Sequence, residues 1–153
     1  ILTTFFTGIM ALGIWYTRRS LDEATKVRTI SAWQTLLQAW GDSESRNARR
    51  YIFVKLKYSS LSAVTDKERD YIENTLASCN RISYMVLAKL IKDEDILYFI
   101  GPSMLQIWDT LKPYIKDRRQ ASQNIANSYR YMRFFEDFIT KYRSVLANSG
   151  QDL

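Results

Sequence analysis

Histidine is absent from this chain of 153 residues, and cysteine occurs once, at Cys79. The chain therefore lacks the commonest general base, the usual zinc ligand and every catalytic triad that contains histidine. Cys79 falls on the apolar side of an expected helix, where a free cysteine normally behaves as a small hydrophobic residue. The acids Asp93, Glu94 and Asp95 lack the spacing of a metal-binding loop and suit the first turn of a helix. The sequence predicts a protein that is not an enzyme and that holds no cofactor and no metal ion.

Glycine and proline are also scarce, with five and two residues. Folds that contain β-sheets normally need more turn-forming residues, which favours an all-α chain. From residue 30 onward, apolar residues recur three and four positions apart, as on one face of an amphipathic helix. The stretch TDKE, from Thr65 to Glu68, is a capping box that marks the start of one such helix. We expect residues 30–147 to form a bundle of about five helices, followed by a tail over residues 148–153.

The first stretch, ILTTFFTGIMALGIWYT, carries no charge and no polar stripe over residues 1–17. A secretory signal has its positive charges before the apolar segment, whereas Arg18 and Arg19 follow it here. Trp15 and Tyr16 stand where an aromatic belt would meet the membrane surface, with the two arginines as the flanking cations. We therefore expect a transmembrane helix over residues 1–17 that is truncated at its start. A buried or interfacial apolar helix is the alternative.

Basic residues after this segment set the expected orientation. Arg18, Arg19, Lys26 and Arg28 place the following domain in the cytoplasm and the N-terminus outside, under the positive-inside rule. Residues 18–29 contain neither glycine nor proline, so we expect the helix to continue through them as a juxtamembrane stalk. The sequence thus predicts a single-pass protein of the cell membrane that also contacts anionic lipid headgroups.

A net charge of +6 is compatible with nucleic acid, anionic lipid or an acidic protein as the partner. A candidate basic interaction face lies on the helix expected over residues 43–58, and it comprises Arg46, Arg49, Arg50 and Lys57. No nucleic-acid-binding motif accompanies these residues. Attraction to lipid headgroups explains the excess charge with fewer assumptions, so we do not expect nucleic acid as the partner.

Three stretches of the chain occur together in a known family. They are SAWQTLLQAWGDSESRNARRYIFVKL, YFIGPSMLQIWDTLKPYIKDRRQ and YRYMRFFEDFITKYR. In this order they resemble the DUF4760 family of uncharacterised bacterial and archaeal proteins, many of which have one N-terminal transmembrane helix before a helical domain. The resemblance covers Ser31 to Arg143. It implies an all-α fold and no particular activity.

The resemblance also singles out a few positions. Trp108, Phe135 and Glu136 match the family's motif, as does either Arg118 or Arg119. We interpret them as a structural cluster, in which an arginine–glutamate pair beside two aromatic rings fixes how the last two helices pack. Breaking one partner of a buried pair of this kind can cost several kcal/mol.

The function expected from these features is that of a non-enzymatic single-pass membrane protein. It would be an accessory or structural subunit of a larger membrane protein complex, with other membrane subunits as its partners. The alternative is a membrane-tethered sensor or regulator that binds an anionic ligand or nucleic acid through the basic face. Binding that weakens steeply with salt would favour that alternative.

Overall fold

The computed structural model describes residues 2–56, 58–122 and 130–149, and within them every regular element is a helix. The described elements are α1 (Leu2–Gly41), α2 (Ser43–Val54), the short 3-10 helix η1 (Leu61–Ala63), α3 (Asp66–Leu87), α4 (Asp93–Phe99), α5 (Gly101–Ala121) and α6 (Arg133–Ser149). The predicted all-α class is confirmed for this part of the chain. Helix α6 continues to Ser149, two residues into the predicted tail, and residues 150–153 of that tail lie outside the described residues.

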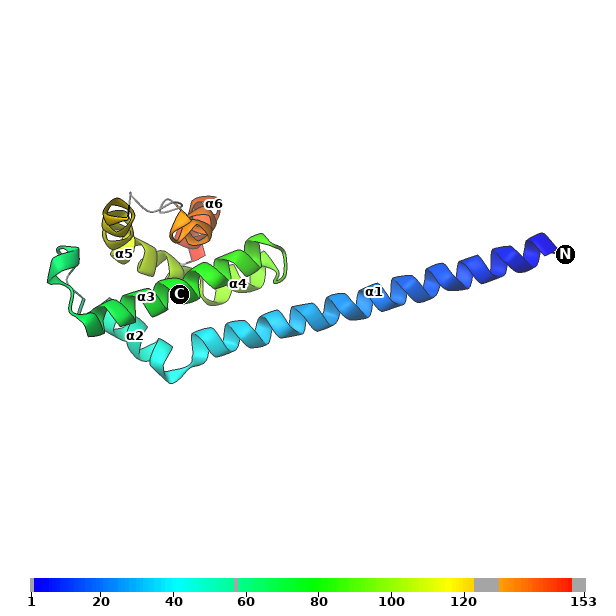
Figure 1. The fold of residues 1–153 in the computed structure, drawn as a ribbon, viewed down its shortest axis with the longest axis horizontal. Coiled ribbons are helices and arrows are strands. Elements are labelled where there is room, and N and C mark those ends of the chain that lie inside the picture. The colour runs from blue at the N-terminus through cyan, green and yellow to red at the C-terminus, as the bar shows by residue number, and fades with distance from the viewer. Residues whose placement is uncertain (1, 57, 123–129, 150–153) are drawn as a thin grey trace.

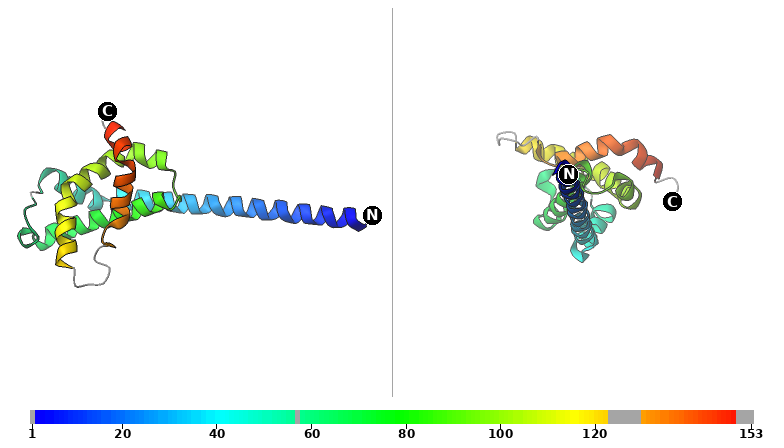
Figure 2. Two further views of the ribbon diagram at one scale, coloured as in Figure 1. Left: turned by 90° about the horizontal axis from the view of Figure 1, so that it is seen from above. Right: turned by 90° about the vertical axis from the view of Figure 1, so that its right-hand side faces the viewer.

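Helix α1 is a single rod of 40 residues that projects from the bundle (Figure 1). Every residue from Gly13 to Arg28 is exposed, and Ala32 is the first buried one. The left view in Figure 2 shows the same projection, with the bundle gathered at the C-terminal end of α1, and in the right view α1 is seen nearly end-on in front of the bundle. The stalk expected over residues 18–29 is therefore the middle of an unbroken helix.

No helix in the described ranges is both long and apolar enough to cross a membrane. From Leu2 to Thr17, α1 rises about 24 Å, whereas the hydrocarbon core of a bilayer is about 30 Å thick. Extending the segment toward its C-terminus brings in Arg18 and Arg19, which lower its mean hydropathy. The prediction of a membrane-spanning helix over residues 1–17 is thus not supported by the described residues.

The bundle is built around α3, which packs against α2 and α6, while α4 and α5 also pack against α6. Its core is one contiguous cluster of apolar side chains drawn from all these helices. The predicted capping box starts α3: the Thr65 hydroxyl accepts from the Glu68 backbone N–H, and the Glu68 carboxylate accepts from the Thr65 N–H at 2.9 Å. Cys79 lies on the buried side of α3, as predicted.

Gly101 joins α4 to α5 at a point of close helix packing. It is buried, and a Cβ atom added to it would lie 2.4 Å from Cδ2 of Leu146 on α6. The absence of a side chain therefore lets the end of α6 approach the start of α5.

Candidate functional site

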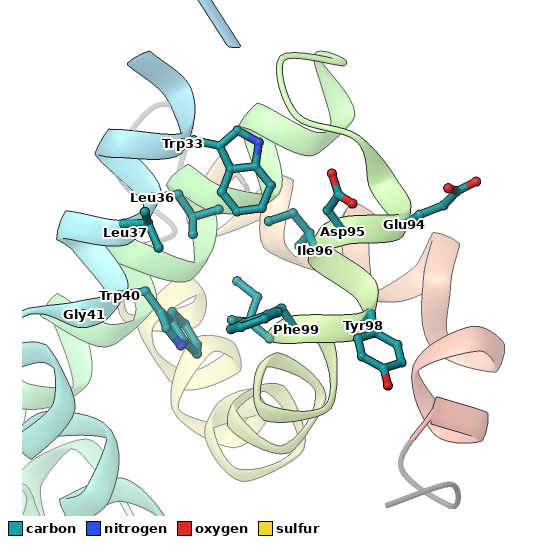
Figure 3. A pocket seen from close by; sticks show the side chains of 11 residues that line it. Trp33, Leu36, Leu37, Trp40, Gly41, Glu94, Asp95, Ile96, Tyr98 and Phe99 are labelled. Carbon is teal, nitrogen blue, oxygen red and sulfur yellow. The ribbon is translucent and has the colours of Figure 1, made fainter. Parts of the chain in front are cut away.

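An apolar groove of about 710 Å³ lies between the C-terminal part of α1 and helix α4. Figure 3 shows Trp33, Leu37 and Trp40 on the α1 side and Tyr98 and Phe99 on the α4 side. Phe99 is 83% exposed and Leu37 is 61% exposed, although both are large apolar residues. The groove is thus an open space between two apolar walls.

The geometry of α4 explains why apolar side chains remain outside. The helix has seven residues, and Ile96 and Leu97 hold it against the bundle. Because successive residues on a helix point about 100° apart, Tyr98 and Phe99 are turned away from the core. They face the groove and the solvent.

Two carboxylates stand at the edge of the groove. Glu94 and Asp95 are exposed and line it, and neither has a hydrogen bond or ion pair with the part of the chain that the structure describes. Their neighbour Asp93 behaves differently, since it pairs with Lys89 at 2.8 Å and accepts a hydrogen bond from the Tyr142 hydroxyl. The Lys89 ammonium holds the pKa of Asp93 below its ordinary value.

The α1 wall of the groove ends at a corner after Gly41, the last residue of α1, and α2 begins just beyond it at Ser43. Arg49 donates from Nη2 to the Trp40 carbonyl oxygen at 2.6 Å, and its guanidinium carbon lies 4.0 Å from the centroid of the Trp40 ring. The Asp42 carboxylate accepts from the Glu44 N–H at 3.0 Å and caps α2. Arg49 therefore satisfies a carbonyl at the end of α1 and holds Trp40 in position.

This corner changes the predicted basic face. Arg49 is only 9% exposed, and burial lowers its pKa from the ordinary value, so it is not a surface residue. Arg46 and Arg50 are exposed on α2 as predicted. Lys57 lies outside the described residues. The prediction was wrong for Arg49 because helical spacing cannot show that the end of α1 turns back over α2.

The residues of the predicted structural cluster form two contacts, one between the aromatic rings and one between Arg119 and Glu136, and the ion pair is partly exposed (25% and 41%) rather than buried. The rings of Trp108 and Phe135 pack edge to face with centroids 5.3 Å apart, and Arg119 pairs with Glu136 at 2.9 Å. Arg119 also donates to the Tyr131 carbonyl oxygen at 2.7 Å. The sequence left two arginines as candidates for this pair, and Arg119 is the one that joins α5 to α6.

Arg118 belongs to a second polar cluster, which the sequence did not reveal. The Glu73 carboxylate on α3 accepts from Arg118 Nε at 3.1 Å, from the Tyr114 hydroxyl at 2.7 Å and from the Tyr131 hydroxyl at 2.6 Å. Burial raises the pKa of both tyrosines, and the bond to Glu73 raises it further. The partners lie 41 to 58 residues from Glu73 in the chain, so no local spacing could have indicated them.

The predicted membrane anchors lie on the exposed part of α1. Trp15, Tyr16, Arg18 and Arg19 are all exposed, and the Arg19 guanidinium lies 5.5 Å from the Trp15 ring centroid. Arg19 also pairs with Glu23 at 3.4 Å, one helical turn further along. These residues are free to contact lipid or another protein.

Two features bear on chemistry. Burial raises the pKa of the Cys79 thiol to about 12, so the thiol stays protonated and unreactive at neutral pH. Over the described ranges, no three histidine, cysteine, aspartate or glutamate side chains are grouped closely enough to hold a metal ion.

Comparison with known proteins gives one match. The sequence profile described as "Domain of unknown function (DUF4760)" matches residues 4–144. No curated protein sequence and no solved structure has significant similarity to the chain.

Proposed function

This chain belongs to the DUF4760 family, and because that family has no assigned function, we propose one from the geometry of the chain itself. The protein is a non-enzymatic accessory or structural subunit of a membrane protein complex. The N-terminal half of α1 lies in the membrane beside helices of other subunits, with the N-terminus outside. The bundle stands on the cytoplasmic side and docks on a partner.

The observation that carries this proposal is the exposure of the projecting half of α1. Ile14, Trp15, Leu21 and Val27 are each more than half exposed, and they lie on the stretch of α1 from Gly13 to Arg28, in which every residue is exposed. A helix without tertiary packing is marginally stable in water, and contiguous exposed apolar surface promotes aggregation. Lipid or other helices must therefore cover this half of α1 in the working protein.

The order of side chains along α1 supports a membrane surface near residue 17. The uncharged stretch ends with Trp15 and Tyr16, and Arg18 and Arg19 follow within one turn. Indole and phenol rings favour the headgroup region, and arginine side chains reach from there into water. Helices of neighbouring subunits would let a short segment with threonines reside in the bilayer, since small polar residues pack well between helices.

The junction between α1 and the bundle is suited to keeping the bundle at a distance from the membrane surface. From Arg19 to Ala32 the continuous helix rises about 20 Å before it meets the core. Ala32 and Leu36 are buried, and Arg49 ties the end of α1 to α2. The bundle is thereby held at a set distance and direction from the membrane surface.

Gentle extraction of the full chain from its native membrane tests the proposal. We expect the protein to enter the membrane fraction and, in mild detergent on a native gel, to migrate with other membrane subunits in fixed stoichiometry, identified by mass spectrometry. The double variant Trp15→Ser, Tyr16→Ser should no longer be recovered in the membrane fraction. Tyr84→Ser, at an exposed aromatic residue on α3, is the control and should still be recovered there. A lone monomer, or wild-type protein recovered entirely in the aqueous fraction, contradicts the proposal.

A further inference from the structure

The groove between α1 and α4 has the shape and composition of a site for a helix. Trp33, Leu37 and Trp40 are spaced four and three residues apart, so they form a row along α1, and Phe99 stands across from them (Figure 3). Proteins bind amphipathic helices in apolar grooves of this kind, where exposed aromatic residues contribute most of the binding energy.

The charge at the groove indicates which helix fits. The chain as a whole carries a net charge of +6, yet the two charged residues that line the groove are both acidic, Glu94 and Asp95. Both are exposed and have no partner within the described residues. A ligand with lysine or arginine beside its apolar face would pair with them, while an acidic ligand would be repelled.

The exposed apolar side of α1 extends beyond the groove toward the projecting half of the helix. Ile30 precedes Leu37 by seven residues, which is two turns, so both point to nearly the same side of α1. Ile30 is 58% exposed, like Leu37. A second helix that runs beside α1 from the membrane can therefore follow this side and enter the groove.

We infer that the groove binds a basic amphipathic helix of a neighbouring membrane subunit, in the cytoplasmic segment that follows that subunit's membrane helix. Cytoplasmic segments next to membrane helices are rich in lysine and arginine, which matches the acidic edge of the groove. The origin of the helix in a membrane subunit rests on the function proposed above. The groove's preference for a basic amphipathic helix rests on its own residues.

Photocrosslinking in the protein's own cells tests this inference. The full chain carries p-benzoylphenylalanine in place of Phe99, or in place of Tyr84 as the control on another exposed surface. After irradiation, mass spectrometry identifies the peptide joined to each position. We expect an adduct at position 99, and not at position 84, with a peptide that has an apolar face and a net positive charge.

Neutral variants of the groove's acids sharpen the test. Glu94→Gln combined with Asp95→Asn should reduce the yield of the adduct at position 99 about fivefold, since two exposed charge pairs are lost. Asp70→Asn, at an exposed carboxylate on α3, should leave the yield unchanged. Circular dichroism establishes that each variant keeps its helix content.

Other adducts overturn the inference. A peptide of this chain would show that a second copy occupies the groove, and a lipid or an acidic peptide would show that the charge argument is wrong. Equal yields at positions 99 and 84 would show that the groove has no particular occupant. If the crosslinked peptide is basic and amphipathic but the protein is not membrane-associated, the proposed function fails and the groove's preference stands. If membrane association holds and position 99 gives no adduct, the groove inference alone fails.

Discussion

On one side of this bundle an aromatic ring is buried and a carboxylate is hydrogen-bonded, whereas on the other side an aromatic ring is exposed and a carboxylate has no partner among the described residues. Where α3, α5 and α6 meet, Phe135 is fully buried against Trp108, and the Glu73 carboxylate accepts three hydrogen bonds. Where α1 meets α4, Phe99 is exposed and the carboxylate of Glu94 has no partner among the described residues. The first side has the properties of a stabilising core, and the second has those of a surface that is completed by binding.

The largest expected effect comes from truncating one phenylalanine on each side. Phe135→Ala removes a buried ring and leaves a cavity, which should lower the free energy of unfolding by about 3–5 kcal/mol. Phe99→Ala should change it by less than about 0.5 kcal/mol, because an exposed side chain has little packing to lose. Urea denaturation followed by circular dichroism measures both. Similar losses for the two variants would remove the distinction between the sides.

A second comparison uses the two carboxylates. Glu73→Ala deprives Arg118 and two tyrosine hydroxyls of their acceptor, which should cost about 1–3 kcal/mol in the free energy of unfolding. Glu94→Ala, measured in the same denaturation experiment, should cost only a few tenths of a kcal/mol, the size expected for an acidic residue in the first turn of a helix. A Glu73→Ala variant as stable as wild type would show that the cluster does not hold α3, α5 and the turn before α6 together.

The Glu73 cluster also predicts a dependence of stability on pH. Burial and the bond to Glu73 raise the pKa of Tyr114 and Tyr131 in the folded protein, so the unfolded chain loses these protons more readily. The stability that these tyrosines contribute is therefore complete below pH about 10 and is lost as the pH rises through their folded pKa values. Thermal unfolding from pH 8 to pH 11 should show this decline. Glu73→Ala should make the decline shallower, and an identical decline would assign it to other groups.

The smallest expected effect concerns the corner between α1 and α2, which sets the α1 wall of the groove. Arg49→Gln should lower the free energy of unfolding by about 1–2 kcal/mol and loosen the direction of α1 relative to the bundle. The variant loses the hydrogen bond from the guanidinium to the Trp40 carbonyl oxygen and the stacking of the guanidinium on the Trp40 ring. Arg50→Gln, at the exposed neighbour, should do neither. Electron–electron distance measurements between spin labels at positions 24 and 112 report the direction of α1. A distribution as narrow as that of wild type would show that Ala32 and Leu36 suffice to hold α1.

Much of the fold could be predicted from local patterns. The scarcity of glycine and proline and the three-and-four spacing of apolar residues predict an all-α chain, and the described residues confirm it. The capping box at Thr65 predicts the start of α3, which is also confirmed. The pairing of an arginine with Glu136 could also be anticipated, but the choice between Arg118 and Arg119 could not. Consecutive helical residues point about 100° apart, so only the placement of α3 and α6 around α5 decides which arginine meets which acid.

Much less of the candidate site could be predicted from the sequence. Glu94 and Asp95 were interpreted as ordinary charges at a helix start, and nothing in their spacing indicates that an apolar groove lies beside them. Arg49 was placed on a surface that it does not occupy. In each case the deciding contact joins segments whose relative position is set by long-range packing.

The sequence by itself determined that the chain is helical, where α3 starts, and that one end of α1 is apolar and bounded by aromatic residues and arginines. These properties follow from backbone preferences and from the spacing of side chains along one helix. The tertiary structure alone decided that Arg49 is buried, that Glu73 on α3 joins α5 and the turn before α6, and that α1 and α4 leave a groove between them. These outcomes depend on how whole helices are oriented, and that orientation is set by packing a single shared core.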